Sequence, residues 1–113
     1  MIFLANSFSL QMLTSSHAIS KCDEISEEKF NQYKDHAESH IGNQDLANML
    51  GVEYHRTGFK MRPGDVLLVA QLSGGRLPEG ATTLPDDVKI RYWCVKLLGE
   101  SESQNNEEIL MEE

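Results

Sequence analysis

Cysteine is scarce in this chain of 113 residues, and the two that occur, Cys22 and Cys94, lie far apart. Their separation matches no spacing of metal ligands, and two thiols are too few for the disulfide framework of a small secreted domain. We therefore expect free thiols in a reducing compartment. Cys94 follows Trp93 in an apolar stretch and is expected to be a small buried core residue.

Long apolar runs are also missing. No segment approaches the roughly 20 apolar residues that cross a bilayer. Residues 1–5 lack the basic region of a secretory signal, and polar residues from Asn6 onward interrupt the apolar stretch early. The sequence therefore predicts a soluble, intracellular protein.

Positive charge is in short supply, because 10 lysines and arginines face 18 carboxylates, for a net charge of −8. Residues 99–113 hold six of these glutamates and no cation, whereas residues 56–98 carry seven cations against four carboxylates. Long nucleic acid needs many spread phosphate contacts, but a few arginines can hold a compact anion. We divide the chain into one domain, residues 1–98, and an acidic tail, residues 99–113, expected to be disordered.

Hydrophobic patterning predicts an α+β fold in that single domain: a mixed sheet of about five strands with helices covering one face. The expected strands are residues 2–6, 17–25, 54–61, 66–72 and 89–98. A turn at residues 62–65 is expected to join residues 54–61 and 66–72 as a hairpin.

Capping residues mark the expected helices. Ser26 is a typical N-cap for a helix that reaches about residue 38. Asn43 is expected to cap a second, short helix that Gly51 closes. Residues 7–13 are expected to form a single helical turn.

The stretch Gly74–Gly80 is the most informative part of the chain, because it sets Arg76 and Glu79 three residues apart behind a predicted buried strand. Pro78 restricts the turn, so the two charged side chains lose less freedom when a ligand binds. This is a plausible phosphate site. An ordinary surface turn with two solvated side chains is the alternative that these residues alone leave open.

Three patches in order carry a resemblance: residues 3–9, the Ile-Gly-Asn of residues 41–43 before a helix, and Arg-Leu-Pro-Glu-Gly at residues 76–80. Together with Arg56 and Gln71 they resemble the viral ring nuclease family of type III anti-CRISPR proteins over roughly residues 2–97. The resemblance implies a homodimer in the cytoplasm of an infected host cell. Its interface would bind the second messenger cyclic tetra-adenylate, without long nucleic acid or membrane as partner.

The reaction implied by the resemblance uses neither a metal nor another cofactor. A ribose 2′-hydroxyl attacks its own phosphate, and a histidine protonates the departing 5′-oxygen. Arg76 would bind a phosphate and Glu79 would help to arrange the site. Arg56 and Gln71 would contact the ligand from strands, although an extra residue between Gln71 and Arg76 departs from the family pattern.

Asn6 and Ser9 match the positions at which the family holds ribose and phosphate, and a strand-end turn is their alternative role. The family histidine that follows Ile-Gly is replaced by Asn43, whose amide cannot deliver a proton near neutral pH. The sequence therefore favours a protein that sequesters its ligand over one that cleaves it.

Another histidine could replace the missing acid. If a helix were continuous, His36, His40 and Asn43 would share one face, and His40 is then the best substitute, ahead of His55. A slow ring nuclease and a pocket reshaped for a different cyclic nucleotide both stay open. So does another class of function: a small interaction protein that keeps the fold but binds a protein partner instead.

Overall fold

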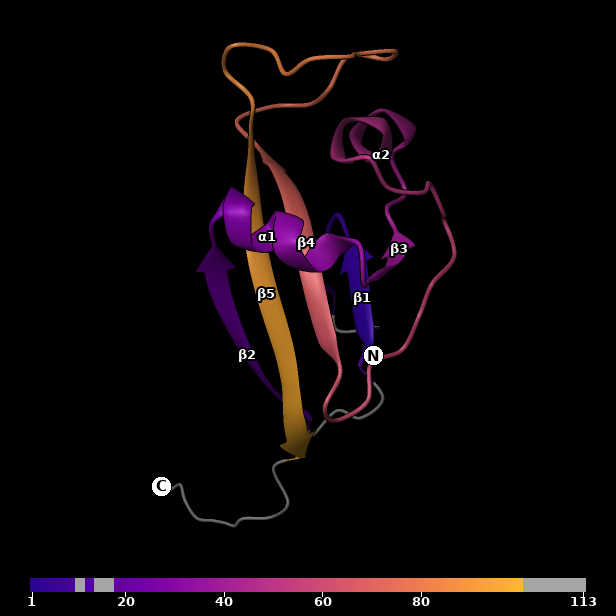
Figure 1. Ribbon diagram of the computed structural model, residues 1–113, viewed down its shortest axis with the longest axis vertical. Helices are drawn as coiled ribbons and strands as arrows, with labels where there is room; N and C mark the ends of the chain where they lie inside the picture. Colours follow the sequence, from indigo (N-terminus) through magenta and orange to yellow (C-terminus); the bar gives the residue numbers. More distant parts are fainter. Residues whose placement is uncertain (10–11, 14–17, 101–113) are drawn as a thin grey trace.

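The computed structural model describes residues 1–9, 12–13 and 18–100, where a five-stranded mixed sheet carries two helices on one face (Figure 1). The predicted α+β class is confirmed. The strands are β1 (Ile2–Ala5), β2 (Ala18–Ile25), β3 (Glu38–His40), β4 (Val66–Ser73) and β5 (Lys89–Glu100), and the helices are α1 (Glu27–Lys34) and α2 (Gln44–Leu50). Residues 101–113 of the expected tail lie outside the described residues.

The strand order β2-β5-β4-β1-β3 brings the N-terminal strand deep into the sheet. β1 pairs in parallel with β3 and with β4, while β5 is antiparallel to β4 and to β2. Because β1, β3 and β4 run in one direction, their carboxyl ends lie at one edge of the sheet, uppermost in Figure 1. The segments that begin at Asn6, Ile41 and Gly74 therefore all start there.

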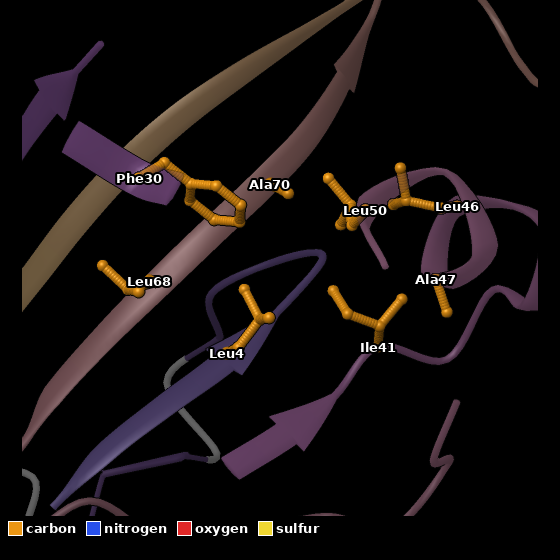
Figure 2. Close-up of a cluster of buried hydrophobic side chains, with 8 residues drawn as sticks. All are labelled: Leu4, Phe30, Ile41, Leu46, Ala47, Leu50, Leu68 and Ala70. Atoms are coloured by element: carbon orange, nitrogen blue, oxygen red, sulfur yellow. The ribbon is translucent and has the colours of Figure 1, made fainter. Parts of the chain in front are cut away.

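Side chains that alternate along the central strands build a separate apolar cluster on each face of the sheet. Leu4 faces the helices, while its neighbours Phe3 and Ala5 face away from them. The helix-side cluster, drawn in Figure 2, contains Leu4, Phe30, Ile41, Leu46, Ala47, Leu50, Leu68 and Ala70. Burying each leucine or phenylalanine in it contributes about 1.5–3 kcal/mol. This packing fixes α2 at the edge where the three parallel strands end.

The α1 helix starts as expected but ends early. Ser26 caps it by accepting a hydrogen bond from the backbone N–H of Lys29 at 3.1 Å, and Phe30 is fully buried. The helix stops at Lys34 rather than near residue 38, so the prediction of its end is wrong. Residues 38–40 instead pair with β1, because those strand hydrogen bonds compete successfully with the weak local preference for helix.

The hairpin predicted across residues 62–65 is also wrong, although its turn exists. The backbone N–H of Asp65 donates to the carbonyl of Arg62 at 2.9 Å. β4, however, already has β1 on one side and β5 on the other, which leaves no edge for residues 54–61. In that range, only isolated bridges occur, at Tyr54 and Met61.

The remaining predicted elements fall partly outside the described residues. In residues 7–13, Met12 donates its backbone N–H to the carbonyl of Ser9 at 3.1 Å, and residues 10–11 lie outside the described part. The second strand begins at Ala18, and residue 17 is not among those described. None of the described helices has the length and apolar character needed to cross a membrane.

Candidate functional site

A cavity of about 640 Å³ opens where β1 and β3 end. Four residues singled out from the sequence line it: Asn6 and Ser9 after β1, His40 at the end of β3, and Arg56 from the segment that follows α2. We call this cavity the edge pocket. Its other lining residues are Ala5, Ser7, Met12, Gly42, Thr57, Gly58, Phe59 and Lys60.

Asn6, Gly42 and Arg56 come together inside the edge pocket. The backbone N–H of Gly42 donates to Oδ1 of Asn6 at 3.3 Å, which ties the end of β1 to the segment after β3. A Cβ atom placed on Gly42 would lie 3.8 Å from Cγ of Arg56, so the arginine stem runs beside this glycine. Arg56 therefore lies beside the segment that follows β3.

Asn43 follows Gly42 directly and begins α2. Its side chain accepts a hydrogen bond from the backbone N–H of Leu46 at 3.1 Å, and Gly51 ends the helix in the left-handed region at φ 72°. The cap predictions for both residues are confirmed. The Asn43 carboxamide oxygen is therefore committed to the helix, and this residue supplies no acidic proton to the site.

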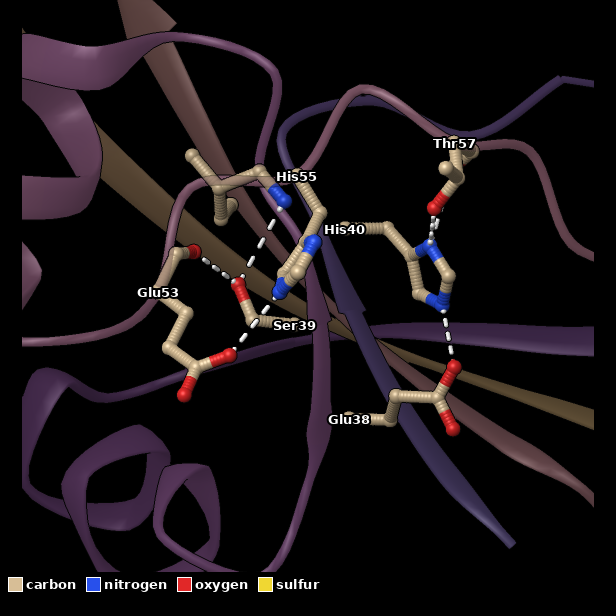
Figure 3. Close-up of polar contacts among 7 residues, drawn as sticks. Glu38, Ser39, His40, Glu53, His55 and Thr57 are labelled. Carbon is tan, nitrogen blue, oxygen red and sulfur yellow. Dashed lines mark hydrogen bonds and ion pairs between the residues drawn. The ribbon is translucent and has the colours of Figure 1, made fainter.

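His40 lies in β3 and not in a helix, so the continuous helix that would have put it on one face with His36 and Asn43 does not form. It nevertheless lines the edge pocket, with a side chain only 7% exposed. As Figure 3 shows, Nε2 lies 2.7 Å from Oε2 of Glu38, and Nδ1 lies 2.9 Å from the carbonyl oxygen of Thr57. Both ring nitrogens therefore have protein partners.

The other histidine considered as an acid, His55, lies outside the edge pocket. Its Nε2 is 2.8 Å from Oε1 of Glu53, and its side chain is about half exposed (Figure 3). Ser39 donates its hydroxyl to the backbone carbonyl of Glu53 at 2.6 Å, on the side of β3 away from His40. His55 is thus part of a polar contact beside the pocket.

The charge of the edge pocket suits an anion. Arg56 and Lys60 line it, and none of its described lining residues is a carboxylate. Cations combined with hydroxyl and amide groups, here Ser9 and Asn6, are typical partners of phosphate. Within the described part of the chain, no group of three or more His, Cys, Asp or Glu side chains could hold a metal ion.

Gln71 lies in a different hollow, on the face of the sheet without helices. Its Oε1 accepts a hydrogen bond from the indole N–H of Trp93 at 3.0 Å. Both line a space of about 270 Å³, which also includes Ser7 and Phe8. Ser7 lines both this hollow and the edge pocket, so it lies between the two spaces.

The Arg76–Gly80 stretch lies over α2 and does not line the edge pocket. The backbone N–H of Gly80 donates to Oδ2 of Asp45 in the first turn of α2 at 2.9 Å, and Leu77 packs against the helix-side cluster. Arg76 and Glu79 are exposed, and neither forms an ion pair with the described residues. These contacts place the stretch at the same edge as the pocket, beyond α2.

A close backbone approach closes the base of the loop at residues 74–88. Gly74 has φ +95°, and a Cβ atom there would lie 2.1 Å from the carbonyl oxygen of Asp87. Only glycine fits this position without rearrangement. The extra residue noted between Gln71 and Arg76 thus falls in a structurally constrained turn.

The resolved pKa shifts belong to groups outside the edge pocket. The hydrogen bond from Arg91 lowers the pKa of Glu24, and both Nε and Nη2 of that arginine contact the carboxylate, at 3.0 and 2.9 Å. Burial raises the pKa of Cys94, so its thiol is poorly activated. Both cysteines are free, as expected, although Cys94 is only partly buried.

Several pocket residues were missed at the sequence level. Thr57, Phe59 and Lys60 line the edge pocket from the segment that was predicted to be a strand. Asp45, which holds Gly80, was also missed. The sequence signal that could have found the first three is a short polar run interrupted by Gly58 and bounded by Arg56 and Lys60, which is more typical of a binding loop than of a strand.

Comparisons with known proteins agree with the architecture. The sequence model of the STIV B116-like family matches residues 2–93. Among solved structures, B116 of Sulfolobus turreted icosahedral virus (STIV) superposes with a TM-score of 0.64 at 24% identity, covering 84% of this chain and 97% of B116. At that identity the structural match supports the fold alone. No curated protein sequence is significantly similar to the chain.

Proposed function

The chain belongs to the STIV B116-like family, and from this premise we propose that it is a viral counter-defence protein that binds a cyclic oligonucleotide second messenger. The expected ligand is cyclic tetra-adenylate, bound at a homodimer interface. The protein acts by removing free messenger from the defence effectors of the infected cell.

The observation that carries this proposal is the edge pocket. Residues matched to the ring nucleases from two separate stretches of sequence, Asn6 and Ser9 in one and Arg56 in the other, line one cavity. A volume of about 640 Å³ is within the range of small-ligand sites, about 300–1,000 Å³. The absence of carboxylates among its described lining residues favours a polyanionic ligand over a basic peptide.

A dimer would pair two such pockets. A cyclic four-fold ligand has two-fold symmetry, so it can make equivalent contacts with two protomers related by a two-fold axis. The sheet face without helices carries a second apolar cluster that includes the partly exposed Trp93 and Phe8. That face offers apolar area to a second copy of the chain.

The side chains of the site favour sequestration over cleavage. In cleavage, a 2′-hydroxyl attacks the adjacent phosphate, a 2′,3′-cyclic phosphate forms, and the departing 5′-oxygen takes a proton. Asn43 supplies no such proton, and His40 would have to leave Thr57 or Glu38 to supply one. Loss of a general acid costs about 10²–10⁴-fold in rate while leaving binding contacts in place.

A direct binding assay tests the proposal. Labelled cyclic tetra-adenylate is titrated with the protein, linear tetra-adenylate serves as control, and products are separated chromatographically after long incubation. We expect saturable binding of one cyclic tetra-adenylate molecule per dimer and little cleavage product. Failure to bind any cyclic oligonucleotide would exclude both sequestration and cleavage and leave the interaction-protein alternative.

Arg56→Ala in the same assay links binding to the edge pocket, and Arg62→Ala, an equal charge change in the turn before β4, is the matched control. We expect only the first substitution to weaken binding. Equal effects of the two would mean that net charge, and not this pocket, governs the affinity.

A further inference from the structure

We propose that His40 is the positioning residue for Arg56: through Thr57 it holds the segment at residues 55–60 against the end of β3, so that the arginine stays at the edge pocket. This inference rests on the proposed function for the role of Arg56, and it goes beyond it by assigning His40 a task other than proton transfer.

The segment that carries Arg56 is fixed at its two ends by backbone hydrogen bonds. The N–H of His55 donates to the carbonyl of Ile41 at 3.0 Å, and the N–H of Met61 donates to the carbonyl of Met12 at 2.6 Å. Between them, residues 56–59 have no regular secondary structure and make no hydrogen bond to the described backbone. Such a stretch opens easily unless side chains hold it.

His40 supplies that hold in the middle of the segment (Figure 3). Its Nδ1 lies 2.9 Å from the carbonyl oxygen of Thr57 and 3.3 Å from the hydroxyl of the same residue. Its Nε2 lies 2.7 Å from Oε2 of Glu38, two residues earlier in β3. The carboxylate thus fixes the ring from the strand side, and the ring fixes Thr57.

The contact with Thr57 exists in both protonation states of the ring. A protonated ring donates Nδ1–H to the Thr57 carbonyl and Nε2–H to Glu38. A neutral ring with its proton on Nδ1 keeps the bond to the Thr57 carbonyl but no longer donates to Glu38. The hold on the segment therefore depends on the Nδ1–H donor.

Aromatic packing adds to this anchor. The His40 ring lies 4.6 Å from the ring of Phe59 and 5.8 Å from that of Phe3, measured between centroids. Phe59 in turn stacks on Phe3 at 4.5 Å. Moving residues 57–59 away from β3 would break both hydrogen bonds and this packing, so the segment has one preferred position.

Arg56 is directly coupled to the anchor, because Thr57 is the next residue in the chain. With the Thr57 carbonyl fixed, the backbone of Arg56 has little freedom, and its stem lies beside Gly42. Binding energy from a charge on a pre-positioned segment is not spent on ordering that segment. The affinity gained through Arg56 therefore depends on His40.

The test compares His40→Phe, which keeps an aromatic ring between Phe3 and Phe59 but removes both hydrogen bonds, with His55→Phe. His55 is the matched control, since it adjoins Arg56 in sequence, pairs with Glu53 and does not line the pocket. His40→Gln, which restores a donor toward Thr57, is the rescue variant. Each is examined by amide hydrogen exchange without ligand and by binding of labelled cyclic tetra-adenylate.

We expect His40→Phe to speed exchange of the His55 and Met61 amides, which are hydrogen-bonded at the two ends of the segment, and to leave α2 and β4 protected. The substitution should also weaken ligand binding about tenfold. His40→Gln should recover part of this affinity, and in an Arg56→Ala background His40→Phe should weaken binding no further. Unchanged exchange, or a loss that adds fully to that of Arg56→Ala, would overturn the inference.

The two proposals fail in different ways. If wild-type protein binds no cyclic oligonucleotide, the proposed function fails, and the exchange data alone decide whether His40 holds the segment. If His40→Phe does not fold, Glu38→Gln replaces it, because this half-exposed side chain is the second partner of the ring. It should produce the same pattern with a smaller amplitude, and its failure to affect exchange would count against the anchor.

Discussion

The two arginine-bearing segments of the site are held by different means. Arg56 lies on a short irregular segment whose middle is fixed by the buried side chain of His40. Arg76 lies on the longer loop at residues 74–88, which is closed at its base by Gly74 and held to α2 through Gly80 and Asp45. The first segment forms a wall of the edge pocket, and the second extends beyond α2.

This difference shows that the most distinctive sequence motif need not lie in the pocket. The Arg76–Gly80 stretch is the clearest motif in the sequence, yet its charged side chains are exposed and outside the pocket. Arg56 has no distinctive motif around it, yet it lies beside Gly42 and lines the edge pocket with Asn6. The experiments below ask whether both segments act on one ligand.

The largest effect is expected from Asn43→His, which restores a general acid beside Gly42. If both segments hold the same phosphodiester, cleavage should increase about 10²–10⁴-fold, and either arginine substitution should reduce the gain. Loss of the present cap is expected to cost about 1 kcal/mol of stability. Product formation is measured by chromatography under single-turnover conditions.

Asn48→His is the matched control for this gain, since residue 48 lies on the exposed side of α2. It should leave the cleavage rate unchanged. A folded Asn43→His variant that binds the ring but forms no more product than wild type would contradict the proposed alignment with the ring nucleases.

The next largest effect is the loss of ligand affinity when Arg56 or Arg76 is replaced by alanine. Removing a charge-assisted phosphate contact costs about 1.5–3 kcal/mol, which corresponds to roughly 10- to 150-fold in affinity. We expect Arg56→Ala to reach this range and Arg76→Ala to lie at its lower end, because Arg56 lines the edge pocket and the Arg76 loop must be ordered around the ligand when it binds. Equilibrium binding measures both. A larger loss of affinity for Arg76→Ala would show that Arg76, and not Arg56, makes the stronger contact with the ligand.

Gly74→Ala tests the base of the second segment. The new Cβ would collide with the carbonyl of Asp87 in a backbone region that disfavours alanine, so we expect a loss of about 1–3 kcal/mol in unfolding free energy. Gly58→Ala, in the first segment, has nothing within 4 Å of the added Cβ and is the control. Denaturant titration measures both, and equal stabilities would show that the loop closure is not rigid.

The smallest expected effect is on folding stability and comes from the Glu24–Arg91 pair on β2 and β5, outside both segments. Arg91 lowers the pKa of Glu24 in the folded protein, so the pair stabilises the fold above the ordinary glutamate pKa, and this contribution is lost as the pH falls through the lowered value. Glu24→Gln should therefore be slightly less stable than wild type at neutral pH and equally stable in acid. Thermal unfolding across pH checks this.

Glu28→Gln makes the same charge change on α1 and is the control for the acid series. Neither substitution should change ligand affinity, because neither residue lines the edge pocket. A change in affinity for Glu24→Gln would indicate that the chain of contacts from Arg91 through Trp93 to Gln71 reaches the site.

The sequence predicted well those parts of the fold that depend on interactions between residues close together in the chain. The caps Ser26, Asn43 and Gly51 define helix ends through hydrogen bonds within a few residues, so they are readable from sequence. The apolar stretches of β4 and β5 are equally plain. The hairpin was wrong because the partner of β4 is β1, and no local pattern specifies a parallel pairing across most of the chain.

The site was less predictable than the fold. β3 has only three residues, two of them polar and one a histidine, so its pairing with β1 comes from tertiary contacts and not from periodicity. The position of His40 follows from that pairing. The roles of Thr57 and Asp45 depend on hydrogen bonds across the fold, which residue spacing does not encode.

The position of β1 between β4 and β3 has a consequence for how the protein acquires its site. β1 is made before β4 during synthesis, yet Ile2 pairs with Val66, so the strand waits for a partner much later in the sequence. Pairings this distant in sequence slow folding. Asn6 and Gly74 follow the two strands that join in that late step, so the edge pocket and the Arg76 loop come together only with the complete sheet, and binding that needs both segments should appear in a single kinetic phase with it.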